Sequence, residues 1–189
     1  MGLTNDQERA LDMIKSGKNV FVTGGGGVGK TFLVHRIVKM EEAKGKTVLL
    51  TASTGIAAMM IGGVTCHRAF GVPHKATWLK KPRLGRDSPV VEADVIIIDE
   101  ISMVRMDVFE YIVGVIELVN KMRLAPDYKG DKKPIQIIAV GDFLQLPPVV
   151  NTDSKDAKTP SEKELMSDYY GLDQIADLSA IACQVYRLH

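Results

Sequence analysis

The residues GGGGVGKT at positions 24–31 stand between an apolar run, Val20–Thr23, and a stretch of helical periodicity over residues 30–43. Glycines let successive backbone N–H groups turn inward around phosphate oxygens, and the N-terminus of the following helix adds partial positive charge there. A flexible glycine linker is the alternative interpretation. Linkers, however, do not end in Gly-Lys-Thr between a strand and a helix. The stretch therefore predicts a phosphate-binding loop and, with it, nucleotide binding.

Each residue type in this loop has a chemical task. Lys30 is expected to reach the β- and γ-phosphates of ATP, and the hydroxyl of Thr31 is expected to hold Mg²⁺. The expected nucleotide contacts come from the whole loop, that is from Gly24, Gly25, Gly26, Gly27, Val28, Gly29, Lys30 and Thr31.

Apolar runs alternate with helical patterns along the chain. The runs cover Val20–Thr23, 48–51, Val95–Asp99 and 135–140, and the helical segments cover 30–43, 54–61 and 104–122. Near-continuous apolar runs are typical of strands whose sheet is covered by helices on both faces. The pattern predicts an α/β domain with a mostly parallel sheet, whose ligands bind at the carboxyl ends of the strands.

Length and composition fit this domain. The chain has 189 residues, of which 46% are hydrophobic, and its 24 basic and 23 acidic residues give a net charge of +1. We expect an ATP-binding domain over 1–150, a polar mobile loop over 151–164, and the C-terminal part of the same domain, ending near an inter-domain cleft, over 165–189. No run of about 18 apolar residues and no charged-then-apolar leader is present, which favours an intracellular, cytoplasmic protein without a membrane partner. Cys66 and Cys183 predict neither a disulfide framework nor a zinc site.

Two further motifs follow apolar strands. Asp99 and Glu100 end one of them, and after a phosphate loop such a pair holds Mg²⁺ through its first acid and activates water through its second. A solvated acidic turn is the alternative. Gln145 follows the last of the apolar runs, in GDFLQLPP at 141–148, and a glutamine there can sense the γ-phosphate, although an ordinary turn would also fit.

Six motifs in a fixed order resemble the first motor domain of superfamily-1 helicases of the Pif and RecD-like group, which move 5′ to 3′ on single-stranded DNA. They are LTNDQ at 3–7, GGGGVGKT at 24–31, TASTGIAA at 51–58, GVTCH at 63–67, IDEISM at 98–103 and GDFLQLPP at 141–148. The resemblance covers residues 3–150 well and the remainder thinly. It implies a RecA-like fold, ATP and Mg²⁺ as cofactors, and work in DNA repair, recombination and telomere maintenance.

The resemblance also implies roles for single residues. Gln7 would read the adenine edge, although Thr4-x-x-Gln7 also spells a helix capping box. Arg187 would face the γ-phosphate, although a basic residue near a chain end is usually solvated. The residues that would contact single-stranded DNA are Thr51, Thr54, Gly55, Thr65 and His67. From the residues alone, Thr54 is a helix N-cap, His67 is a partly buried histidine, and Trp78 lies in a solvated basic loop.

The family's motor has a second RecA-like domain, which this chain lacks. The expectation is therefore a monomeric ATP-binding half of a larger helicase that binds nucleotide alone but hydrolyses it slowly. A phosphate-loop ATPase that is not a nucleic-acid motor remains an alternative, as does a non-catalytic nucleotide-binding module. The first gives no reason for the motifs at 51–58 and 141–148. In the second, Glu100 and Gln145 would be superfluous.

Overall fold

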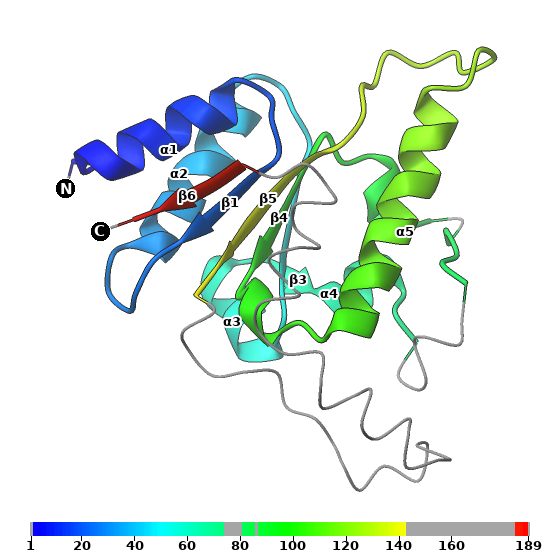
Figure 1. Ribbon diagram of the computed structural model, residues 1–189. Helices are drawn as coiled ribbons and strands as arrows, with labels where there is room; N and C mark the ends of the chain where they lie inside the picture. Colours follow the sequence, from blue (N-terminus) through cyan, green and yellow to red (C-terminus); the bar gives the residue numbers. More distant parts are fainter. Residues whose placement is uncertain (1, 74–80, 86, 143–183, 189) are drawn as a thin grey trace, which may run out of the picture.

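The sheet consists of six strands, each paired in parallel with its neighbours. They are β1 (Val20–Thr23), β2 (Val48–Ala52), β3 (Val64–Thr65), β4 (Val95–Asp99), β5 (Gln136–Gly141) and β6 (Gln184–Arg187). Their order across the sheet is β3-β2-β4-β5-β1-β6 (Figure 1). The computed structural model describes residues 2–73, 81–85, 87–142 and 184–188. The predicted mobile loop over 151–164 and the Trp78 loop lie outside these residues.

Within the described residues, five α-helices and two short 3₁₀ helices accompany the strands. The α-helices are α1 (Asn5–Lys15), α2 (Lys30–Glu42), α3 (Gly55–Ile61), α4 (Cys66–Phe70) and α5 (Met106–Arg123), and the 3₁₀ helices are η2 (Pro89–Val91) and η3 (Ile101–Met103). Figure 1 shows α1 and α2 on one side of the sheet and α5 on the other. None of the helices in the described part of the chain is long and apolar enough to cross a bilayer.

Alternate residues of the central strands feed two separate cores. Val20, Val22 and Ile97 belong to the core under α1 and α2, whereas Phe21 and Ile96 belong to the core under α4 and α5. Successive side chains of a strand point to opposite faces, so an apolar run buried on both faces needs a helix layer on each. The predicted α/β fold with helices on both faces is confirmed, and its four predicted strands agree with the observed ones to within one residue at each end.

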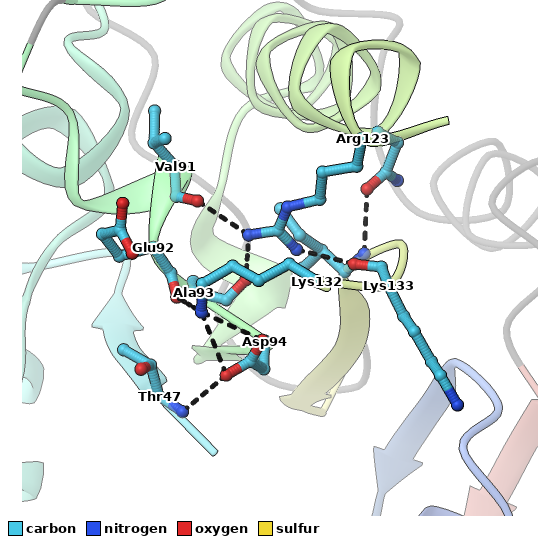
Figure 2. Close-up of polar contacts among 10 residues, drawn as sticks. Thr47, Val91, Glu92, Ala93, Asp94, Arg123, Lys132 and Lys133 are labelled. Atoms are coloured by element: carbon cyan, nitrogen blue, oxygen red, sulfur yellow. Dashed lines mark hydrogen bonds and ion pairs between the residues drawn. The ribbon is translucent and has the colours of Figure 1, made fainter. Parts of the chain in front are cut away.

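A buried arginine closes the amino edge of the sheet. Arg123, at the end of α5, donates hydrogen bonds to the carbonyl oxygens of Lys133 at 2.7 Å, Val91 at 2.7 Å and Ala93 at 2.8 Å (Figure 2). Beside it, the carboxylate of Asp94 forms an ion pair with Lys132 at 3.2 Å and accepts the backbone N–H of Thr47 at 2.8 Å. These contacts join the end of α5 to the residues that lead into β4 and β5, and Asp94 to the residue before β2. They lie at the amino edge of the sheet, opposite the carboxyl edge where ligands are expected.

Candidate functional site at the carboxyl edge of the sheet

The glycine-rich loop joins β1 to α2 at the carboxyl edge. Gly27 and Gly29 have φ angles of 79° and 83°, in the left-handed region that favours glycine. Gly29 is also the residue before the first turn of α2, and a Cβ atom there would lie 2.6 Å from Nε2 of Gln7. Gly24 faces a similar limit, because a Cβ atom would lie 2.9 Å from the carbonyl oxygen of Leu188. Gly27 and Gly29 are therefore required by the loop's backbone, and Gly24 and Gly29 by its neighbours.

Lys30 is folded over this loop. Its Nζ donates to the carbonyl oxygen of Gly24 at 2.7 Å and to that of Gly25 at 2.9 Å. The ammonium group thus lies over the start of the loop, held by two of its carbonyl oxygens. Thr31 follows it in the first turn of α2, and its side chain is exposed.

Asp99 and Glu100 end β4, two strands away from the loop in the order of the sheet. The Asp99 side chain is buried, and its Oδ1 accepts the backbone N–H of Glu100 at 3.0 Å. Burial raises the pKa of the Asp99 carboxyl, and the charge of Glu100 adds to the rise. The hydrogen bond from Glu100 and the positive charges of Lys30 and His35 oppose it. The charge of Lys30 therefore reaches the Asp99 carboxyl electrostatically.

The donor set fits a magnesium ion. One carboxylate and one hydroxyl, from Asp99 and Thr31, are hard oxygen ligands, and Mg²⁺ is usually held by one or two such groups together with phosphate oxygens and water. Within the described ranges, no cluster of three or more His, Cys, Asp or Glu side chains could hold a metal by itself. A metal site built partly from the nucleotide is consistent with both facts.

Gln7 connects α1 to the loop. Its Oε1 accepts the backbone N–H of Thr4 at 3.1 Å, and the Thr4 hydroxyl accepts the backbone N–H of Gln7 at 3.2 Å, so the capping box is confirmed. Its Nε2 also donates to the carbonyl oxygen of Val28 at 3.2 Å. An amide has two N–H groups and two acceptor positions, so one of each remains for an adenine edge. The expected adenine contact stays a prediction.

The threonines expected on DNA differ in their surroundings. Thr54 caps α3 by accepting the N–H of Ala57, and Thr65 caps α4 by accepting the N–H of Arg68. Both hydroxyls keep their own hydrogen for another acceptor. Thr51, in contrast, is fully buried, and its hydroxyl donates to the carbonyl oxygen of Ile97 at 2.8 Å.

The buried position of Thr51 is at odds with the expectation that its side chain contacts DNA. It serves the sheet instead, because its hydroxyl bridges β2 to β4 and accepts the Cys66 thiol at 3.7 Å. Cys66 is buried at the start of α4, and its pKa is raised to about 11 by burial, which agrees with a packing role. Gly55 begins α3 and is exposed, while His67 is half-buried on α4.

The structure places Arg187 beside the phosphate loop. β6 runs parallel to β1, with Arg187 opposite Thr23, the residue directly before Gly24. The Arg187 side chain is exposed, and the next residue, Leu188, donates its N–H to the Thr23 carbonyl at 2.7 Å. Gln145 lies outside the described residues, so its position relative to the loop stays a prediction.

Two features around the loop carry no sequence signal. The hydroxyl of Tyr186 donates to the Asp6 carboxylate at 3.3 Å, and this links β6 to α1. Glu100 has a φ of 52°, the only positive value for a residue other than glycine in the part of the chain described. A tyrosine in an edge strand and an acid after a strand are both common, so only the three-dimensional arrangement could reveal either feature.

The chain is similar to known proteins over most of its length. The family model described as PIF1-like helicase matches residues 2–167. The chain is 36% identical over 163 residues to the ATP-dependent DNA helicase Pif1 of Bdellovibrio bacteriovorus, and the match covers 82% of this chain and 35% of the relative. It is 38% identical over 158 residues to the ATP-dependent DNA helicase PIF1 of Danio rerio, covering 81% of this chain and 24% of the relative.

A solved structure gives the same result in three dimensions. The Pif1 helicase from Bacteroides in complex with ADP-AlF3 and ssDNA superposes with a TM-score of 0.63 at 33% identity, over 90% of this chain and 37% of that one. The chain thus spans about a third or less of the relatives and of the structure that it matches. The family model covers far more than half of the chain, in the same residues that build the loop and the acidic pair. The chain belongs to the PIF1-like helicase family.

Proposed function

We propose that this chain is the ATP-binding and ATP-hydrolysing part of a helicase that moves 5′ to 3′ on single-stranded DNA. The observation that carries the proposal is the meeting of three features at one edge of the sheet. These are the phosphate loop with Lys30 folded over it, the acidic pair at the end of β4, and the exposed Arg187 beside the start of the loop. Relatives of the family carry the names of ATP-dependent DNA helicases.

In the proposed mechanism, backbone N–H groups of residues 24–31 surround the phosphates of ATP. Lys30 exchanges its two carbonyl partners for β- and γ-phosphate oxygens, because an ammonium binds a charged phosphate more strongly than a neutral carbonyl. Thr31 and Asp99 would hold Mg²⁺, which when bound neutralises the charge that develops on the phosphates. Gln7 keeps its bond to the Val28 carbonyl and reads the adenine edge with its remaining N–H and acceptor position.

Glu100 is the proposed general base. It follows Asp99 directly, and its backbone N–H is fixed on the Asp99 carboxylate, so its own carboxylate is free to orient and deprotonate the attacking water. Gln145 is proposed to sense the γ-phosphate, and Arg187 to stabilise the charge that develops on it. Both roles are inferred from the family resemblance and, for Arg187, from the pairing of β6 with β1.

The proposed DNA surface uses Thr54 and Gly55 after β2, Thr65 at the end of β3, and His67 on α4. Thr54 and Thr65 offer hydroxyl hydrogens to phosphate oxygens. Gly55 lets the strand approach the backbone closely, and His67 offers its imidazole ring as a further contact. Thr51 is left out because it is buried. The natural partners in this proposal are single-stranded DNA and a second RecA-like domain, in a monomeric protein that works inside the cell.

ATP hydrolysis tests the proposal. The natural protein, in its full length, is assayed with Mg²⁺ in the presence and absence of a single-stranded oligonucleotide, beside the variants Lys30→Ala and Lys18→Ala. Lys18 is an exposed lysine at the amino edge of the sheet, so it controls for loss of a charge. We expect strong stimulation by the strand, retained in Lys18→Ala and lost in Lys30→Ala. Turnover indifferent to the strand would instead favour an ATPase that is not a nucleic-acid motor.

A further inference from the structure

A basic pocket lies between α4, α5 and residues 81–85 and 87–89. It has a volume of about 990 Å³, and Arg68, Lys81 and Arg83 line it with a single acidic side chain, Asp87, among the described residues. The chain as a whole is nearly neutral, with 24 basic and 23 acidic residues. The local excess of positive charge therefore marks this pocket as a candidate anion site.

One wall of the pocket is held in place on α5. Pro82 lies against Gly114, where a Cβ atom on the glycine would come within 2.3 Å of the proline ring. The backbone N–H of Arg83 donates to the Tyr111 hydroxyl at 3.3 Å, and Leu84 packs against the core under α5. These three contacts fix the backbone of residues 82–84 against α5. The side chains of Lys81 and Arg83, on either side of Pro82, are therefore attached to a fixed backbone.

The three cations are available to a ligand. Arg68, Lys81 and Arg83 are exposed, and none of them forms an ion pair with another residue that the structure describes. The aromatic rings of the pocket offer little, because Phe70 and Tyr111 are only 2% and 6% exposed. A ligand would thus be bound by charge and hardly by stacking.

Arg68 joins the pocket to the proposed DNA surface along the chain. Arg68 directly follows His67 on α4, and its backbone N–H is the group that the Thr65 hydroxyl accepts. We propose that the sugar-phosphate backbone of the bound strand extends from Thr65 and His67 into this pocket, where Arg68, Lys81 and Arg83 neutralise its phosphates. This inference rests on the proposed function and adds a second contact region to it. Contacts to phosphates alone read no sequence, so they contribute affinity and salt dependence.

Salt-dependent binding of a labelled oligodeoxythymidine strand tests the pocket. The full-length protein is compared with the double variant Lys81→Gln/Arg83→Gln and with a control that removes the same charge, Lys18→Gln/Lys39→Gln. Lys18 and Lys39 are exposed, and they lie before β1 and on α2, away from the pocket. Arg68 stays unchanged because it adjoins His67.

We expect the pocket variant to bind roughly tenfold more weakly at low salt, and its slope of log K against log salt to fall by about 0.7 for each phosphate that the variant no longer neutralises. The control should keep the wild-type affinity and slope. Equal slopes in the two double variants would overturn the pocket while leaving the proposed function intact. Failure of the wild-type protein to bind the strand would overturn the proposed function, and this inference with it.

Chemical labelling gives a second measurement that does not depend on a variant. Acetylation of surface lysines with and without the strand should show protection of Lys81 and no protection of Lys18 or Lys39. Unchanged acetylation of Lys81 under conditions where the strand is bound would contradict its place in the pocket.

Discussion

Glu100 shows how a single residue can trade stability for chemistry. Its φ of 52° places it in the left-handed region, where a side chain at Cβ crowds the following carbonyl oxygen. The strain is imposed locally, because its N–H is fixed on the Asp99 carboxylate and the 3₁₀ turn η3 begins at the next residue. Strain of this kind persists where the surrounding structure enforces it, and it gathers at functional sites.

The strain can be measured by comparing two variants that both remove the carboxylate. We expect Glu100→Gly and Glu100→Ala to lose ATP turnover alike. The glycine variant should be the more stable of the two by about 1 kcal/mol, because glycine adopts this conformation without a Cβ penalty. At a position with negative φ, the alanine variant would be the more stable of the two, since glycine gains more entropy on unfolding. Urea unfolding of the two variants decides the matter, and an alanine variant at least as stable as the glycine variant would show that Glu100 is unstrained.

The residues of the site were only partly predictable. The loop at 24–31 and the pair Asp99 and Glu100 have spacings that their chemistry requires, so they stand out in the sequence. The contact of Gln7 with Val28 and the burial of Thr51 do not, because they depend on how α1 meets the loop and how β2 meets β4. A threonine at a strand end looks the same whether its hydroxyl faces solvent or a neighbouring carbonyl.

Among the elements, the four central strands were visible as apolar runs, whereas β3 and β6 were not. β3 has two residues and β6 four, and each lies at an edge of the sheet with a single neighbour. A short edge strand exists through its pairing and carries little pattern of its own. The same holds for α4, whose five residues are too few to show a helical period.

Arg123 is the element-scale contact with the largest expected effect on stability. Its planar guanidinium supplies donors to three carbonyl oxygens, two of them before β4 and one before β5 (Figure 2). We expect Arg123→Met to lower the free energy of unfolding by about 3 kcal/mol, because it leaves buried carbonyls without donors. Arg123→Lys should recover only part of the loss, since a single ammonium cannot span the same acceptors.

The matched control for Arg123 is Lys121→Met on the same helix. Lys121 is exposed and lies 3.9 Å from Glu117, so its removal should change the stability by less than about 0.5 kcal/mol. Urea denaturation measures all three variants. An Arg123→Met protein as stable as the control would mean that the carbonyls find other donors.

A buried carboxylate near the C-terminal end of α2 should make the free energy of unfolding depend on pH. Glu41 is buried, and its carboxylate forms ion pairs with Lys44 and Lys46, each at 2.6 Å. Burial is the largest single influence and would raise its pKa. The hydrogen bonds and charges of the two lysines together outweigh it, and the pKa of Glu41 lies below the ordinary value of 4.5.

Because the folded protein holds this proton more weakly than the unfolded chain, the stabilisation is present above a pH of about 4.5 and is lost as the pH falls through the lowered pKa. We expect Glu41→Gln to cost about 2 kcal/mol at pH 7 and to flatten the loss of stability below pH 4.5. Urea unfolding at a series of pH values checks both effects. If the free energy of unfolding falls as steeply below pH 4.5 in the variant as in the wild type, other carboxylates cause the pH dependence.

At the scale of the whole molecule, the phosphate loop lies at an open edge of one domain. The match to the Bdellovibrio relative spans 35% of that protein, so most of the relative has no counterpart in these 189 residues. Within the described residues, Arg187 is the arginine paired by register with the strand that leads into the loop. In the proposed function, a second RecA-like domain supplies further arginines to the nucleotide, and arginines in such positions accelerate phosphoryl transfer by about 10³- to 10⁵-fold.

These 189 residues alone should therefore bind ATP with Mg²⁺ through the loop, yet turn it over at least roughly a thousandfold more slowly than the full-length protein and separate no strands. Binding is measured with a fluorescent nucleotide and turnover by phosphate release, with Lys30→Ala as the control that should abolish both. Loss of binding together with turnover would point instead to a loop that folds only beside the rest of the protein. Turnover at the full-length rate would mean that this edge already holds every group the reaction needs, because a site completed from outside cannot work at full speed without its second half.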